Sequence, residues 1–276
     1  MKVGLLQLNV GSDPATNLVT TLALVDDAVR QGAEFVLTPE ITNCMTFDRS
    51  YQRTILHRPD TDPTLAALRE AARRHRIWLL IGSISVLTED AEGRFANRSF
   101  LIAPDGTIAA TYDKIHMFDV TVSETEVYRE SAGYRPGDRA VLADTPWGRV
   151  GMAICYDLRF PHLFRQLAQA GASFLTIPAA FTATTGAAHW HVLMRARAIE
   201  TGCFVLAPAQ TGSHRVSADR TVQTFGHSLV VAPWGEVVLD AGTEVGAHVA
   251  DIDPEDVARA RARVPAWQHE PGWTAP

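Results

Sequence analysis

Three residues whose side chains could act together on a carbonyl carbon each stand directly after a short apolar segment. They are Cys155, Glu40 and Lys114, which follow residues 150–154, 35–39 and 108–113. The composition of these segments predicts strands. A side chain just past a strand can reach a crevice at the edge of a sheet, where open α/β folds bind ligands. If the three strands share one sheet and run the same way, a thiol, a carboxylate and an ammonium group converge at one edge.

These three groups together suit the covalent hydrolysis of an amide. A thiol attacks a carbonyl carbon as thiolate, and with a reference pKa of about 8.5 it needs a base nearby. We expect Glu40 to take the proton from Cys155, deliver it to the departing nitrogen, and then activate water against the thioester. We expect Lys114 and the backbone N–H of Tyr156 to hold the developing oxyanion, since each such donor typically contributes about 3 kcal/mol.

Other interpretations of the same residues remain open at this point. A free cysteine is often a small buried hydrophobe, and a single Glu or Lys is usually a surface charge. The sequence also has ten histidines, and histidine is the usual base beside a catalytic cysteine, so we rank a Cys–His site second. His189 and His191 lie two apart on an expected helix and point in different directions, which argues against a metal pair; we expect both to be structural.

Length and cysteine usage indicate one large α/β domain spanning residues 1–276. The three cysteines, Cys44, Cys155 and Cys203, are widely spaced without a CxxC motif, so we expect neither disulfides nor a thiolate zinc site. This pattern favours a reducing, cytoplasmic location. The apolar run at residues 1–8 is too short to span a membrane, and we interpret it as the first strand.

The charge distribution argues against several classes of partner. The net charge is −6, with acidic and basic residues spread along the chain, so no surface for nucleic acid or an anionic membrane is indicated. The basic cluster at residues 69–76 falls on an expected helix and is interpreted as a solvated face. We expect a small-molecule substrate, with no metal and no cofactor.

Helical patterns alternate with short strands, and similar segments recur in the two halves of the chain. The expected helices span residues 14–31, 63–75, 160–170, 189–201 and 254–263. The recurring pairs are residues 2–6 with 149–153, 32–37 with 171–176, and 99–106 with 228–235. Two strand-rich halves with helices on one face can bury their bare sheet faces against each other. We therefore expect an α/β fold, a four-layer αββα sandwich with internal pseudo-twofold halves; a doubly wound sheet is the alternative.

The duplication also predicts that the site is single and asymmetric. Cys155 corresponds to Leu8 in the other half, and Glu40 corresponds to the neighbourhood of Ala179. Nucleophile and base are therefore each found in only one half.

With these residues in place, the sequence resembles the nitrilase superfamily of carbon-nitrogen hydrolases, whose Glu-Lys-Cys triad stands on an αββα sandwich. The resemblance covers nearly the whole chain and is carried by residues 37–40, 112–119, 154–161, 185–190, 195–200 and 225–228. It is strongest to the branch of deaminated glutathione amidases and ω-amidases, and residues 209–214 favour the former. The resemblance implies an amidase that acts on a small linear amide such as deaminated glutathione or a 2-oxo acid ω-amide.

The resemblance implies roles for further residues. Glu130 matches a second glutamate of the family, in preference to Glu124 or Glu126, and would orient Lys114 or the substrate amide. Arg159 is placed to bind a substrate carboxylate. Superfamily members usually pair, so we expect at least a homodimer.

The sequence departs from the family pattern in two places. His191 stands where these enzymes usually carry glutamate, and the tail from Val264 to Trp273 lacks the usual ending. A nitrilase or an amide acyltransferase would use the same triad, and a catalytically silent binding or scaffold homologue is an alternative of another class. Retention of the four candidate residues argues against the silent homologue.

Overall fold

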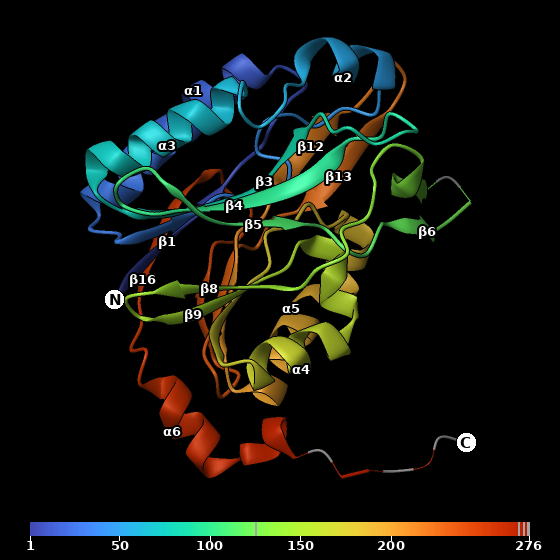
Figure 1. The fold of residues 1–276 in the computed structure, drawn as a ribbon. Helices are drawn as coiled ribbons and strands as arrows, with labels where there is room; N and C mark the ends of the chain where they lie inside the picture. The colour runs from blue at the N-terminus through green and yellow to red at the C-terminus, as the bar shows by residue number, and fades with distance from the viewer. Residues whose placement is uncertain (125, 270, 273, 275–276) are drawn as a thin grey trace.

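Two six-stranded sheets lie at the centre of the computed structural model, which describes residues 1–124, 126–269, 271–272 and 274 (Figure 1). The first has the order β16 (Gly246–Asp251), β1 (Lys2–Gln7), β2 (Phe35–Leu37), β3 (Trp78–Val86), β4 (Ala96–Ile102) and β5 (Ile108–Asp113). The second has the order β15 (Val237–Asp240), β14 (Leu229–Val231), β11 (Phe204–Ala207), β10 (Ala172–Thr176), β9 (Gly148–Met152) and β8 (Val141–Thr145).

Helices cover the outer face of each sheet, so the predicted four-layer αββα sandwich is confirmed (Figure 1). Helices α1 (Pro14–Arg30) and α3 (Pro63–His75) pack on the first sheet, and α4 (Pro161–Gln169) and α5 (Ala183–Thr201) pack on the second. Alternate side chains of a strand point to opposite faces. In β2, Phe35 and Leu37 accordingly join the core between the sheets, whereas Val36 joins the core under α1 and α3.

The two sheets have the same internal order, which bears out the predicted halves. In the first, β1, β2 and β3 run parallel and β4 and β5 follow antiparallel. In the second, β9, β10 and β11 run parallel and β14 and β15 follow antiparallel. An antiparallel strand completes each set on the other side, β16 beside β1 and β8 beside β9. The first sheet therefore takes one strand from the end of the second half.

Shorter elements connect these layers. Two small antiparallel pairs lie outside the main sheets, β6 (Asp119–Thr121) with β7 (Val127–Arg129), and β12 (Thr211–Arg215) with β13 (Thr221–Phe225). Helix α2 (Arg49–Ile55), which was not predicted, begins where Asp48 accepts a 3.0 Å hydrogen bond from Tyr51 N–H. No helix in the described ranges is long and apolar enough to cross a bilayer.

The expected helices form, most of them with shifted ends. Helix α5 begins at Ala183, six residues before the predicted start, because Thr182 caps it by accepting a hydrogen bond from Thr185 N–H. Helix α6 (Asp256–Arg263) begins two residues later than predicted.

The atypical tail packs against the second half of the molecule. A short 3₁₀ turn (Pro265–Gln268) follows α6, and Arg165 donates hydrogen bonds to the carbonyls of Ala266 and His269. Glu270 and Trp273, which also belong to the atypical ending, lie outside the described residues.

Candidate active site

The segments that carry Glu40, Lys114 and Cys155 come from both sheets. Glu40 follows β2 and Lys114 follows β5, and these strands run in the same direction within the first sheet. Cys155 follows β9 in the second sheet. The arrangement considered from the sequence, in which all three strands share one sheet, is therefore wrong. The three segments meet where the two sheets face each other.

Glu40 is fixed by close packing between β2 and β3. Thr38 N–H donates to Leu80 O at 2.9 Å, and Ser83 N–H donates to Pro39 O at 3.2 Å. Gly82 permits this approach, since a Cβ at this position would lie 1.9 Å from Thr38 O. The Glu40 backbone carbonyl accepts a 3.0 Å hydrogen bond from Gln210 Nε2 of the other half. The backbone that carries the carboxylate is therefore held from two sides.

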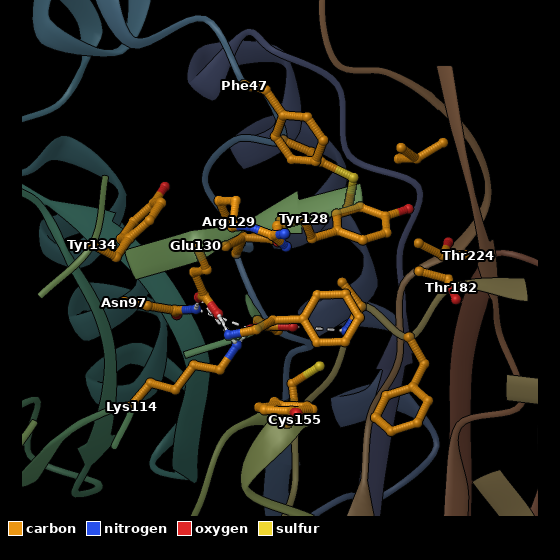
Figure 2. Close-up of a pocket in the computed structure, with 18 of the residues that line it drawn as sticks. Phe47, Asn97, Lys114, Tyr128, Arg129, Glu130, Tyr134, Cys155, Thr182 and Thr224 are labelled. Atoms are coloured by element: carbon orange, nitrogen blue, oxygen red, sulfur yellow. Dashed lines mark hydrogen bonds and ion pairs between the residues drawn. The ribbon is translucent and has the colours of Figure 1, made fainter. Parts of the chain in front are cut away.

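Lys114 lies between two carboxylates. Its Nζ donates to Glu40 Oε1 at 2.9 Å and to Glu130 Oε2 at 2.8 Å, and only 2% of its side chain is exposed. Glu130 Oε2 also accepts a 2.7 Å hydrogen bond from Phe118 N–H, which fixes this carboxylate from the other side. Figure 2 shows the ends of the Lys114 and Glu130 side chains pointing toward each other, with Lys114 beside Cys155. The structure thus brings together the predicted Glu40, Lys114 and Glu130.

Asn97 is a further member of this cluster that the sequence analysis missed. Its Nδ2 donates to Glu40 Oε1 at 2.9 Å and to Glu130 Oε1 at 3.3 Å, so it joins the two carboxylates (Figure 2). A signal was present, because asparagine is depleted in strands and Asn97 stands just before the recurring segment at residues 99–106. Glu126, by contrast, contacts Thr184 and Tyr128 and does not join the cluster.

Cys155 is presented by a strained turn at the end of the β9 segment. Its φ of 51° lies in the left-handed region, which non-glycine residues rarely adopt. Its N–H donates to Pro178 O at 2.9 Å, and a 3₁₀ turn starts at the residue itself. The side chain is 7% exposed and borders a cavity, toward which its sulfur points in Figure 2.

A buried carboxylate holds this turn in place. Asp157 is fully buried and accepts hydrogen bonds from Tyr112 Oη at 2.7 Å and from Ile154 N–H at 2.9 Å. It also accepts from His116 N–H at 3.0 Å and contacts His116 Nδ1 at 2.7 Å. Asp157 therefore ties the turn that carries Cys155 to the segment that carries Lys114.

The charges of the cluster set the protonation of the thiol and the amine. Burial alone would lower the pKa of Lys114, but the carboxylates of Glu130 and Glu40 outweigh it and raise that pKa well above the usual value. Burial also raises the pKa of the Cys155 thiol, and the Glu40 carboxylate, which accepts a hydrogen bond from it, raises this pKa further against the opposing effect of Lys114. The resting site therefore holds an ammonium group and a neutral thiol with a carboxylate in contact.

A cavity of about 360 Å³ opens above the thiol. Aromatic and aliphatic side chains form much of its wall, among them Phe47, Phe118, Val127, Tyr128 and Phe181. Arg129, Arg159 and Arg220 also line it, and none of the three forms an ion pair with a carboxylate of a described residue. The predicted Arg159 contacts His189 Nδ1 at 3.3 Å and stands over the ring of Phe181.

His189 and His191 point to different groups, as predicted. His189 contacts Arg159, whereas His191 Nε2 contacts Asp240 Oδ2 at 2.9 Å. The counterpart of Cys155 in the other half, Leu8, is 1% exposed and pairs with Gln210. The nucleophile and its carboxylate partner are thus brought together at one position.

The chain is similar to known proteins over nearly its whole length. A family model described as Carbon-nitrogen hydrolase matches residues 2–262. The chain is 39% identical to a deaminated glutathione amidase of Yersinia enterocolitica, covering 97% of this chain and 92% of that protein. It is 35% identical to the human omega-amidase NIT2, covering 98% and 94% of the two chains.

A solved structure confirms the fold. The NitFhit protein of C. elegans superposes with a TM-score of 0.87 at 34% identity, over 98% of this chain and 64% of that one. The predicted resemblance to the branch of deaminated glutathione amidases and ω-amidases is confirmed by the relatives. Family model, relatives and architecture together establish that the chain belongs to the carbon-nitrogen hydrolase family.

Proposed function

We propose that this chain hydrolyses a small linear amide through a thioester on Cys155, releasing ammonia and a carboxylate without a metal or cofactor. The observation that carries the proposal is the geometry at the floor of the cavity, where Lys114 Nζ lies 2.9 Å from the Glu40 carboxylate and Cys155 lines the same cavity as both. Residues 1–276 act as one domain in this proposal, because both sheets contribute to the site.

In the acylation step, Cys155 Sγ adds to the amide carbon while Glu40 takes the thiol proton. The amide oxygen gains the negative charge, which Lys114 Nζ and the backbone N–H of Tyr156 stabilise. That N–H stands in the first turn after β9 and finds no acceptor among the described residues. Glu40 then donates its proton to the nitrogen, the C–N bond breaks, and ammonia leaves.

In the deacylation step, Glu40 takes a proton from water as the water oxygen adds to the thioester carbon. The C–S bond then breaks, the proton returns to sulfur, and the acid product leaves. Glu130 acts as a positioning residue in this sequence, since it holds Lys114 from the side opposite Glu40.

The substrate that we propose carries negative charge away from the reacting amide. The relatives named above are a deaminated glutathione amidase and an omega-amidase, and we infer deaminated glutathione or a related 2-oxo acid ω-amide here. The guanidinium groups of Arg129, Arg159 and Arg220, which line the cavity without an ion pair to a described carboxylate, support an anionic substrate, because arginine binds carboxylates with two parallel hydrogen bonds.

Ammonia release from deaminated glutathione, 2-oxoglutaramate and a neutral aliphatic amide of similar length tests this proposal. We expect turnover of one or both anionic amides, its loss in Cys155→Ser, and a fall of about 10²–10⁴ in kcat in Glu40→Gln with the fold retained. Arg159→Gln should raise KM for the anionic amides more than for the neutral one. Unchanged turnover in Glu40→Gln would remove this carboxylate from the mechanism.

We also propose that the chain forms a homodimer. An apolar face runs over α5 and the β14–β15 hairpin, where the large exposed residues are Val192 (69% exposed), Ile199 (56%), Val238 (44%) and Trp234 (43%). Burying such a face against a second copy is favourable. Light scattering should give about twice the chain mass of 30.1 kDa, and Val192→Asp should shift it toward the monomer. A monomeric mass for the unaltered chain would refute the dimer.

We infer a cytoplasmic location. The three cysteines are free and buried, and Cys155 has to stay a thiol to act. Reducing compartments maintain thiols in this state.

A further inference from the structure

Three potential metal ligands outside the catalytic cluster converge from separate elements. His191 lies on α5, His227 lies between β13 and β14, and Asp240 ends β15. His191 Nε2 lies 2.9 Å from Asp240 Oδ2, and His227 Nδ1 lies 2.8 Å from Asp240 Oδ1. One ligand atom from each residue lies within 4.8 Å of the other two. Each imidazole thus faces its own oxygen of one shared carboxylate.

The surrounding backbone holds two of these residues firmly. His227 adopts a left-handed φ of 56°, its N–H donates to Gly242 O at 2.6 Å, and its carbonyl accepts from Trp190 Nε1 at 2.8 Å. Asp240 Oδ1 also accepts a 2.9 Å hydrogen bond from Gly242 N–H. A ligand carboxylate fixed by a backbone donor is the kind of support that orients metal ligands.

We propose that His191, His227 and Asp240 bind a divalent transition metal ion, with Zn²⁺ as the best fit. Imidazole nitrogens are borderline donors and a carboxylate oxygen is a hard one, and Zn²⁺ sites in proteins use both. The side chains are 37%, 26% and 33% exposed, so an ion can enter and water can fill the fourth position.

Binding requires the ligand atoms, which now lie within 4.8 Å of one another, to take up tetrahedral spacing. Tetrahedral Zn²⁺ with bonds of about 2.0–2.1 Å places its ligand atoms about 3.3 Å apart. The present N···O contacts of 2.8 and 2.9 Å therefore widen slightly as the ion replaces the protons that the imidazoles share with the carboxylate.

The ion would connect the second sheet to a wall of the active-site cavity. Phe225 stacks on His227 with ring centroids 4.5 Å apart, and its N–H donates to Phe181 O at 3.0 Å. Phe181 and Thr224 both line the cavity. Cross-linking α5, β15 and the segment of His227 would stabilise this wall, and neither Glu40 nor Cys155 takes part.

A direct metal titration tests the site without relying on amide turnover. Chelator-treated protein is titrated with Co²⁺ while visible absorption is followed, and with Zn²⁺ by calorimetry. We expect one ion per chain, ligand-field bands typical of a nitrogen and oxygen site, and a higher Tm with Zn²⁺. His191→Gln and Asp240→Asn should each weaken binding by at least about tenfold, since loss of even a supporting residue costs about 10–100-fold.

His75→Gln is the matched control, because His75 pairs with Asp26 at 2.7 Å on the opposite helical layer without a second imidazole. We expect this variant to bind the ion as the unaltered chain does. Absence of Co²⁺ bands from the unaltered chain, or equal affinity in His191→Gln and His75→Gln, would overturn the proposal. Because neither readout uses catalysis, this result is independent of whether the chain is an amidase.

Discussion

At the scale of single residues, the chemistry of the candidate site depends on which group holds the proton of the Cys155 thiol. The carboxylate of Glu40 contacts both the ammonium group of Lys114 and the thiol of Cys155. A thiolate–ammonium pair would need no base, whereas a neutral thiol needs one at the moment of attack. Because the pKa of the Cys155 thiol is raised, the thiol needs a base, and Glu40 is the carboxylate that removes its proton.

Glu40→Gln should lower the pKa of the Cys155 thiol. Burial remains in this variant, but the negative charge and the hydrogen-bond acceptor that raise this pKa are both lost, while Lys114 still lowers it. The pH dependence of iodoacetamide alkylation, followed by mass spectrometry of the peptide that contains Cys155, measures the shift. The midpoint should move to lower pH than in the unaltered chain, and a midpoint that rises or stays would contradict the assignment.

Asp157→Asn should destabilise the fold by about 3 kcal/mol, because the amide group cannot accept all the hydrogen bonds that the buried carboxylate receives. Urea unfolding gives the free energy. Asp144→Asn is the control, since Asp144 is 82% exposed in its ion pair with Arg149 and should change stability by less than about 1 kcal/mol. Equal effects of the two substitutions would refute the structural role of Asp157.

At the scale of secondary structure, strand ends and tight crossings set the geometry of the site. The close approach of β3 to the segment before Glu40 depends on Gly82. Backbone hydrogen bonds from Thr38 to Leu80 and from Ser83 to Pro39 lie on the two sides of this contact. The two segments cannot move apart without breaking them.

Gly82→Ala should destabilise the protein by at least about 3 kcal/mol or prevent folding, because the added methyl would clash with backbone atoms. Gly11→Ala offers a matched comparison, since a Cβ there meets nothing within 4 Å. Thermal unfolding of the two variants gives the difference. If Gly82→Ala melts within a few degrees of Gly11→Ala, the packing described for β2 and β3 is wrong.

Elements with strong local signals could be predicted from the sequence, and those formed by tertiary contacts could not. Helix α3 matches its prediction of residues 63–75 because Asp62 and Pro63 mark its start. Helix α2 was missed because its seven residues are mostly polar, and the first six residues of α5 were missed because Thr-Thr-Gly is a weak helix former. The cluster of His191, His227 and Asp240 could not be foreseen either, since its members come from three elements.

At the scale of the whole molecule, buried thiols make the free energy of unfolding depend on pH in the alkaline range. Burial raises the pKa of Cys44 to about 12, with a smaller contribution from Asp62. Because this pKa is higher in the folded state, the unfolded chain loses its proton first as pH rises. The contribution of the protonated Cys44 thiol to stability is therefore fully present below its ordinary pKa of about 9. This contribution decreases between pH 9 and pH 12.

The difference in stability between the unaltered chain and Cys44→Ala should therefore shrink as pH rises above about 9, by up to about 1.4 kcal/mol per pH unit. Urea unfolding at pH 7, 9 and 10 checks this, with alanine chosen because it lacks the titrating group. A difference that stays constant over this range would show that Cys44 ionises equally well in both states.

The pairing of β16 with β1 joins the two duplicated halves, because a strand from the end of the chain completes the first sheet. Residues 246–251 cover the backbone of β1, and Lys2 stands opposite Asp251. A fragment limited to the first half would leave β1 as an uncovered edge strand, with free N–H and C=O groups that favour aggregation. The repeats are therefore interlocked, and we expect the isolated N-terminal half to aggregate.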